Sequence, residues 1–249
     1  MPKRLKHQKR GKGSPTFTAT KKGPGKSSHI DLNDEQKKDV ITGEIIELLN
    51  DPGRTAILAK TLFENGKIEY LIAAEGINLG QTIEVGTKAK ISIGNVSFLK
   101  DLPEGCPIFN IELIPGDGGK LVKSSGLYAL VMTKEKEKVF VKLPSGKIIP
   151  MKPGARATIG CISGGGRQEK PFIKAGKKFH AMKARSRPYP SVRGVAMNPV
   201  DHPFGGSQHH PGKSKSTPRS APSGRKVGAI ASKRTGTGRK KKNIKQVKQ

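Results

Sequence analysis

Acidic residues are almost missing from both ends of this chain. Its 249 residues include 48 Lys and Arg against 19 Asp and Glu, a formal net charge of +29. Residues 1–30 hold nine cations and no acid, and residues 181–249 hold 17 cations and one acid. Residues 31–130 carry a net charge of −5, and residues 131–180 a net charge of +9. A nearly neutral body with basic ends is typical of a chain whose partner is a polyanion.

Large apolar side chains are scarce as well. Only 33% of the residues are hydrophobic and 4% aromatic, Trp is absent, and Gly and Pro number 31 and 18. This composition excludes a single compact core that includes the whole chain, and each basic end has too few apolar residues to fold by itself. No apolar run reaches the roughly 18 residues of a membrane span, and residues 1–30 contain no apolar segment of a secretion signal. We therefore expect a cytoplasmic protein with no membrane partner.

The residues that usually hold metals or form disulfides are few. Cys106 and Cys161 form no CxxC pair and provide no disulfide framework, so we expect two reduced thiols that act as small apolar side chains. His202, His209 and His210 lie close in sequence, but structural zinc sites use two closely spaced ligand pairs and the second pair is missing. We predict no metal site in the protein.

Alternation of apolar and polar residues predicts strands. It occurs at residues 67–72, 88–93 and 139–143, each with three apolar residues on one face. Asn65-Gly66 predicts a type I′ hairpin between Ile57–Phe63 and Lys67–Ala73. Short strands separated by such turns favour small barrels.

Further turns and one helix complete the predicted elements. Asp51-Pro52-Gly53 and Pro144-Ser145-Gly146 have the composition of turns. The segment PGDGGK, Pro115–Lys120, is a plausible break between two barrels. Lys174–Arg185 is the one stretch that favours a short helix.

The basic C-terminal region contains an unusual segment, GVAMNPVDHPFGG, from Gly194 to Gly206. An Asp201-His202 catalytic dyad is disfavoured because neighbouring side chains of an extended chain point to opposite faces, and Pro203 keeps His202 extended. No nearby Ser or Cys completes a triad. An ordered loop that makes contacts without catalysis is the favoured interpretation.

Two glycine-rich segments resemble phosphate-binding loops to different degrees. GPGKSS, Gly23–Ser28, lacks both the earlier glycine and the preceding strand of a nucleotide-binding loop, so nucleotide hydrolysis is rejected. In SGGGRQEK, Ser163–Lys170, consecutive glycines could form an anion-binding nest beside Arg167, and a flexible turn is the alternative.

Several long motifs resemble one family, the universal second protein of the large ribosomal subunit, in its archaeal and eukaryotic branch. They are VRGVAMNPVDHPFGG (192–206), IPGDGGKLV (114–122), NDPGRTA (50–56), RATIG (156–160) and GGGRQEKPFIKAGKKFH (164–180). The resemblance implies a mainly β fold: an OB-type five-stranded barrel followed by an SH3-like barrel, with extended basic tails. The implied domains are a basic N-terminal extension (1–37), the OB-fold barrel (38–115), the SH3-like barrel (116–183) and an RNA-threading C-terminal tail (184–249).

The resemblance also implies a function. Such a protein is a structural constituent that binds large-subunit ribosomal RNA directly, supports the region around the peptidyl transferase centre and helps the subunits associate. Its expected partners are that RNA, neighbouring ribosomal proteins and the small subunit, with the protein present as a monomer within the ribosome. No catalytic residue and no cofactor are expected, and any Mg²⁺ would be held mainly by the RNA.

Candidate site residues follow from the basic motifs and the resemblance together. Those expected to bind RNA are Arg4, Arg10, Arg54, Lys120, Lys123, Arg156, Arg167, Lys174, Lys177, Lys178, Arg187, Arg193, Asn198, His202, Arg219, Arg225, Lys226 and Arg234. The loop expected near the peptidyl transferase centre contributes Gly194, Met197, Asn198, Asp201, His202, Gly205 and Gly206.

Two questions stay open at this point. A carboxylate among phosphates is repelled, so Asp201 could hold an Arg or Lys, accept from a base amino group, or bind hydrated Mg²⁺. The charge pattern alone would also suit an architectural DNA or chromatin protein, although tails that bind without regard to sequence do not need the motif-dense segment 192–206.

Overall fold

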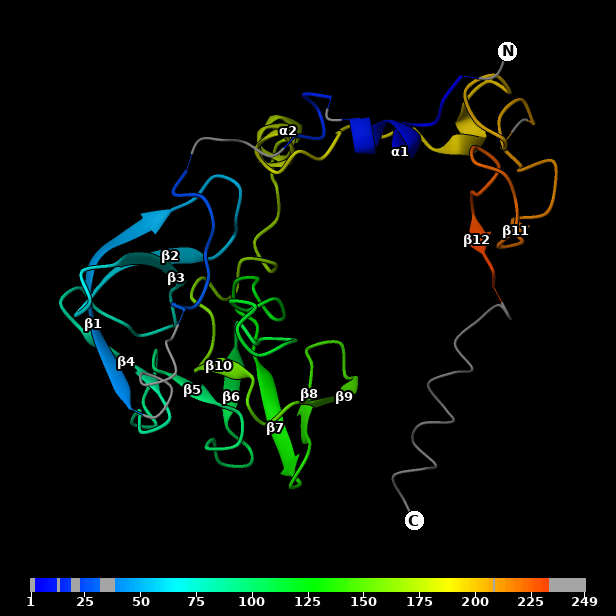
Figure 1. The fold of residues 1–249 in the computed structure, drawn as a ribbon. Helices are drawn as coiled ribbons and strands as arrows, with labels where there is room; N and C mark the ends of the chain where they lie inside the picture. The colour runs from blue at the N-terminus through cyan, green and yellow to red at the C-terminus, as the bar shows by residue number, and fades with distance from the viewer. Residues whose placement is uncertain (1–2, 13, 19–22, 32–38, 208, 233–249) are drawn as a thin grey trace. The chain divides into compact units, whose positions relative to one another are not determined.

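The computed structural model describes residues 3–12, 14–18, 23–31, 39–207 and 209–232 (Figure 1). The chain divides into two compact units. The larger unit contains residues 19–186, and the smaller unit combines residues 1–18 with residues 187–249.

The larger unit is mainly β, which confirms the predicted fold class. Its strands form a ten-stranded sheet in the order β3-β2-β1-β4-β5-β10-β6-β7-β8-β9, in which only the β4–β5 pair is parallel. Figure 1 shows β1 to β4 curled into one barrel and β6 to β9 into another, with β5 and β10 between them. The strands are β1 (Val40–Asn50), β2 (Ile57–Phe63), β3 (Ile68–Ile72), β4 (Thr82–Gly86), β5 (Val96–Phe98), β6 (Pro107–Phe109), β7 (Ala129–Lys134), β8 (Val139–Lys142), β9 (Ile148–Met151) and β10 (Arg156–Ile159).

The first barrel, the OB-type one, closes around the inward face of β1. Ile41 and Ile45 are buried there, and Gly43 lies between them. A Cβ on Gly43 would stand 2.7 Å from the ring of Phe63, so only glycine lets that ring fill the barrel. A register shift between Ile45 and Glu47 bends β1, which pairs with β4 in its first half and with β2 along most of its length.

The second barrel, the SH3-like one, has its own core. Leu99, Leu102 and Ile108 are fully buried and pack with Val131 and Val141 of the later strands. β10 joins the two barrels because it pairs with β5 on one side and with β6 on the other. The core of the second barrel contains residues from both sides of the predicted division at residues 115 and 116.

The predicted strands at residues 67–72 and 139–143 are confirmed as β3 and β8, but the predicted strand at residues 88–93 is wrong. Ile91 and Ile93 are exposed in a loop. The side-chain amide of Asn95 donates to the carbonyl of Lys90 at 3.0 Å, and its oxygen accepts from the backbone of Glu84. These bonds give the segment an alternative to a sheet ladder.

The hairpin between β2 and β3 is confirmed, although its turn is not type I′. Gly66 has a φ of +74°, and Asn65 is absent from the residues with positive φ. The amide of Gly66 donates to Phe63 at 2.8 Å, so residues 63–66 form a type I turn followed by a left-handed glycine. The turns at residues 51–54 and 143–146 are confirmed by their closing backbone hydrogen bonds.

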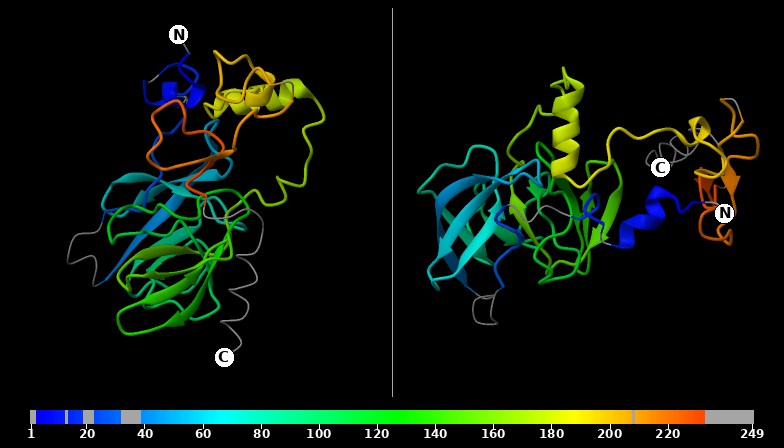
Figure 2. Two further views of the ribbon diagram at one scale, coloured as in Figure 1. Left: turned by 90° about the vertical axis from the view of Figure 1, so that its right-hand side faces the viewer. Right: turned by 90° about the horizontal axis from the view of Figure 1, so that it is seen from above.

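The predicted helix is confirmed as α2 (Ala175–Ala184), the yellow-green helix in both views of Figure 2, which has no buried residue. Among the described residues, no helix is long and apolar enough to cross a membrane.

The smaller unit is built from both ends of the chain. Its elements are α1 (Lys6–Lys9), the 3₁₀ turns η1 (Arg10–Lys12) and η2 (Gly194–Ala196), and the paired strands β11 (Ser216–Thr217) and β12 (Ala229–Ile230). Leu5, Phe204 and Val227 form its core, with Val195 packed against them. Each end taken alone has few apolar side chains, but together they supply a shared core.

Candidate nucleic-acid interface

The segment from Gly194 to Gly206 is a compact loop held by its own backbone. It begins as η2, and the amide of Gly206 returns to the carbonyl of Met197 at 3.0 Å. The amide of His202 donates to Asn198 at 3.2 Å, and the amide of Gly205 donates to His202 at 2.9 Å. The expected ordered loop is therefore present, and its own backbone hydrogen bonds hold it.

The loop glycines are required by contacts inside the loop. A Cβ on Gly194 would run into the ring of His202, and one on Gly205 would run into the carbonyl of Asn198. Gly206 combines a φ of +79° with a Cβ position only 2.5 Å from Pro199. These glycines are expected near the peptidyl transferase centre, and the contacts observed for them are within the loop.

The His202 side chain is fixed and its chemistry follows from its contacts. Its Nδ1 accepts a hydrogen bond from the amide of Phe204 at 3.0 Å, so the neutral ring carries its proton on Nε2. Its ring lies 5.3 Å from that of Phe204. Burial, and then the charge of His7, lowers the pKa of His202. The ring therefore acts as a neutral hydrogen-bond donor at neutral pH.

Asp201 faces the N-terminal end of the chain. Its carboxylate lies 3.2 Å from Nζ of Lys3, and the amide of Lys3 donates to the carbonyl of Val200 at 2.8 Å. Of the three roles left open for Asp201, the structure supports the first, the holding of a Lys. Since His202 and Asp201 have these different partners, the geometry is not that of a catalytic dyad.

The loop is anchored by the shared core of the smaller unit. Phe204 is buried between Leu5 of the N-terminal arm and Val227 of the C-terminal region. The hydroxyl of buried Thr217 donates to the carbonyl of Val227 at 2.8 Å, and Gly228 lies against the ring of Phe204. Three segments far apart in the sequence thus meet around one aromatic ring.

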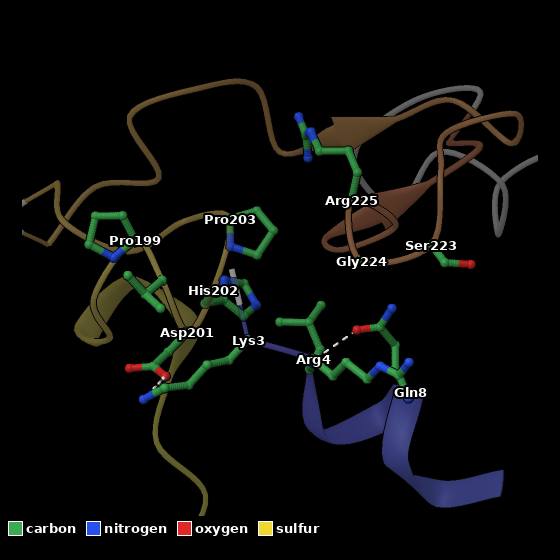
Figure 3. A pocket seen from close by; sticks show the side chains of 12 residues that line it. Lys3, Arg4, Gln8, Pro199, Asp201, His202, Pro203, Ser223, Gly224 and Arg225 are labelled. Carbon is green, nitrogen blue, oxygen red and sulfur yellow. Dashed lines mark hydrogen bonds and ion pairs between the residues drawn. The ribbon is translucent and has the colours of Figure 1, made fainter. Parts of the chain in front are cut away.

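A pocket of about 370 Å³ lies where these segments meet (Figure 3). Its walls come from residues 3–5, Gln8, 199–203 and 223–225. Figure 3 shows Lys3, Arg4 and Gln8 along one side, with Arg225 and His202 on the others.

Most residues expected to bind RNA lie on the surface. Arg234 lies outside the described residues, and six of the others are half-buried, namely Arg54, Lys123, Arg167, Lys178, His202 and Arg225. The exposed ones are Arg4, Arg10, Lys120, Lys174, Lys177, Arg187, Arg193, Asn198, Arg219 and Lys226.

Arg156 is a correction to the expected RNA contacts. Its side chain is 4% exposed, and its guanidinium lies 2.7 Å from the fully buried carboxylate of Glu112 and donates to the carbonyl of Ile30. Burial would raise the pKa of Glu112, but the hydrogen bonds and charge of Arg156 outweigh it and lower that pKa. Arg156 therefore has a structural role, which its sequence motif did not reveal.

Three more residues expected to bind RNA have side-chain partners within the larger unit. Nε of Arg54 lies 2.8 Å from Asp51, and Nε of Arg167 donates to Ser125 at 3.0 Å. Nζ of Lys123 donates to the carbonyl of Ser27 at 3.0 Å, and burial, followed by the charge of Arg54, lowers its pKa to about 8. These side chains have less freedom to reach a phosphate than the exposed cations.

Sequence reasoning missed the residues that connect the ends of the chain. Leu5 is the one apolar residue within the basic run PKRLKHQKR, and that isolation was the available signal. Nothing in the pattern paired Lys3 with Asp201. Within the described residues, no three His, Cys, Asp or Glu side chains gather as a metal site would require.

These observations define a class of protein: a basic β protein with two barrels, and a smaller unit that contains a loop held by its own hydrogen bonds and exposes several cations. Comparison with known families identifies the family to which the chain belongs. Residues 2–85 match the model for the RNA-binding N-terminal domain of ribosomal proteins L2, and residues 92–226 match the model for the L2 C-terminal domain. The chain belongs to the ribosomal protein L2 family.

Its relatives agree over nearly their whole length. The chain is 50% identical over 238 residues to the large ribosomal subunit protein uL2 of Methanococcus aeolicus, covering 95% of this chain and 99% of that protein. It is also 50% identical to the proteins of that name from Methanocaldococcus jannaschii, over 239 residues, and Halorubrum lacusprofundi, over 243 residues. These relatives are archaeal, which confirms the resemblance to the archaeal and eukaryotic branch.

Proposed function

We propose that this protein is a structural constituent of the large ribosomal subunit and binds large-subunit ribosomal RNA directly. The observation that carries the proposal is a loop held by its own hydrogen bonds, in a unit that also exposes Arg193, Arg219 and Lys226. The relatives of the chain are named as large-subunit proteins. The cytoplasmic ribosome is its place of action. The comparisons give the alternative of an architectural DNA-binding protein no support.

Two surfaces make the RNA contacts. Arg193, Arg219 and Lys226 of the smaller unit neutralise phosphates, and each such contact releases counterions. On the larger unit, Lys174 and Lys177 bind phosphates around α2, a helix without buried residues. Phe172 and Phe179, both more than 40% exposed, offer faces on which unpaired bases stack.

The loop 194–206 lies near the peptidyl transferase centre and supports the RNA there. Asp201 and His202 serve as contacts, since their separate partners do not form a proton-transfer pair. The RNA performs the chemistry, the protein is not an enzyme, and Mg²⁺ is held mainly by RNA phosphates. The protein works as a monomer within the ribosome, beside other ribosomal proteins and close to the small subunit.

The test is binding of the purified full-length chain to its large-subunit RNA at physiological salt. We expect saturable, Mg²⁺-dependent binding. The logarithm of the association constant should fall with the logarithm of the salt concentration, with a slope of about 0.7 to 0.9 per phosphate contact. Random duplex DNA of equal length is the control. Equal affinity for that DNA would refute the specific function, as would a chain that never sediments with large subunits.

A second arm tests the loop. In ribosomes carrying His202→Ala or Asp201→Ala, we expect impaired subunit association or peptide transfer with normal barrel stability. Unchanged activity in both would contradict a role at the centre.

A further inference from the structure

We propose that the pocket between the N-terminal arm and the C-terminal region receives one unstacked RNA nucleotide. The inference rests on the proposed function and adds a defined site to it. The pocket has a volume of about 370 Å³, and its walls come from residues 3–5, Gln8, 199–203 and 223–225 (Figure 3).

The polar groups around the pocket are mostly hydrogen-bond donors. Arg4 and Arg225 contribute guanidinium groups, and His202 contributes its Nε2 proton because its Nδ1 is occupied by the amide of Phe204. Gln8 has its side-chain oxygen bonded to the amide of Leu5 at 2.8 Å, which leaves the donor end of that amide for a ligand. The one carboxylate, that of Asp201, is neutralised by Lys3.

A donor-rich lining selects a ligand rich in acceptors. A nucleotide has phosphate oxygens for the guanidinium groups and ring nitrogens or carbonyl oxygens for the amide and imidazole donors. A metal cation is excluded by the same donors. An acidic peptide could pair with the cations of the pocket, but its carboxylates provide no flat ring to cover the apolar walls.

The apolar parts of the pocket suit a base. Pro199, Pro203 and Leu5 contribute rigid or buried apolar surface, and the pocket has the dimensions of a small-ligand site. A base that has left its helix keeps its flat faces out of water when it lies against such surfaces. The contacts inside the loop 194–206 hold these walls in place before RNA arrives, which reduces the ordering cost of binding.

The experiment fills the pocket without changing its charge. Ser223 is exposed and lines the pocket, and Ser220 is also exposed but lies outside the lining, so Ser223→Phe and Ser220→Phe form a matched pair. Affinity of the full-length chain for its large-subunit RNA is measured at physiological salt. We expect Ser223→Phe to weaken binding at least tenfold and Ser220→Phe to change it less than twofold, with equal thermal unfolding midpoints.

A second measurement identifies the ligand. Adenosine, guanosine, cytidine and uridine 5′-monophosphates, and inorganic phosphate alone, are titrated into the isotopically labelled chain. We expect nucleotides to shift the amide signals of Gly224 and Arg225, with phosphate alone at least tenfold weaker. Equal binding of phosphate alone, or no shift with any nucleotide, would overturn the proposal.

The two levels of inference can be separated. If wild-type protein binds the RNA saturably and Ser223→Phe binds it equally well, the pocket has no nucleotide and the proposed function stands. If wild-type protein does not bind the RNA, the proposed function itself has failed.

Discussion

Leu5→Ala tests whether the two ends of the chain form one cooperative unit. Leu5 is 6% exposed and is one of three residues in the small core, beside Phe204 and Val227. Truncation of a buried leucine costs about 2 to 5 kcal/mol, and a core this small relaxes around the gap, so we expect about 2 to 3 kcal/mol. Each 1.4 kcal/mol is a factor of ten, so the equilibrium for local opening should rise roughly 30- to 140-fold.

The assay is native-state hydrogen exchange on the full-length protein. The amides of Gly206 and Ala229, which donate to Met197 and Lys215, should lose protection in Leu5→Ala. Amides of the larger unit, such as that of Ile159, should exchange as in the wild type. Leu79→Ala is the matched control, because Leu79 is 61% exposed and the same atoms are removed.

Two results would refute the reasoning. If Leu5→Ala leaves Gly206 and Ala229 as protected as in the wild type, the N-terminal arm does not support the C-terminal loop. If amide protection in Leu5→Ala falls equally in both units, the chain unfolds as one body, and the small core is not a separate cooperative unit.

The remaining predictions concern the loop and the buried charges. Gly194→Ala should displace the histidine ring packed against that glycine and weaken RNA binding severalfold, measured by titration, whereas Gly11→Ala, which has open space around it, should not. Glu112→Ala leaves a buried guanidinium unpaired and should cost the larger unit about 3 to 5 kcal/mol in urea unfolding, while Asp39→Ala, from an exposed pair, should cost less than about 1 kcal/mol. Burial lowers the pKa of His29 from 6.5 to about 4, so as pH falls the unfolded chain binds a proton on this histidine before the folded protein does. The folded protein should therefore lose up to about 3 kcal/mol of stability as pH falls from about 6.5 to 4. The free energy of unfolding at pH 7 and pH 4.5 should differ less in His29→Gln than in the wild type, and an identical difference would contradict this assignment.

Local patterns predicted the elements whose stabilising contacts are close in sequence. The alternation at residues 139–143 gave β8, and the Asn65-Gly66 pair gave a hairpin, because each pattern is satisfied by the nearest strand. The same alternation at residues 88–93 failed. There the side chain of Asn95 forms hydrogen bonds with nearby backbone, and the segment folds into a loop. Such bonds compete with strand pairing, and the alternation of apolar and polar residues gives no sign of them.

Charge was assigned correctly by region and less reliably by residue. Composition alone placed cations at both ends of the chain, and most of the expected residues are exposed. Arg156 differs because Glu112, 44 positions earlier, meets it in the barrel. A basic residue in a strand looks the same in sequence whether its partner is a buried carboxylate or a phosphate.

The sequence by itself determined the mainly β class, the basic ends and the family, because composition, alternation and long motifs are properties of the chain read in order. Only the tertiary structure decided that the arm and the C-terminal region share a core and form a pocket. Leu5, Phe204 and Val227 stand about 200 residues apart at their extremes, and their burial is favourable only when all three meet. No pattern along the chain records that meeting, because it depends on contacts between apolar side chains from both ends of the chain.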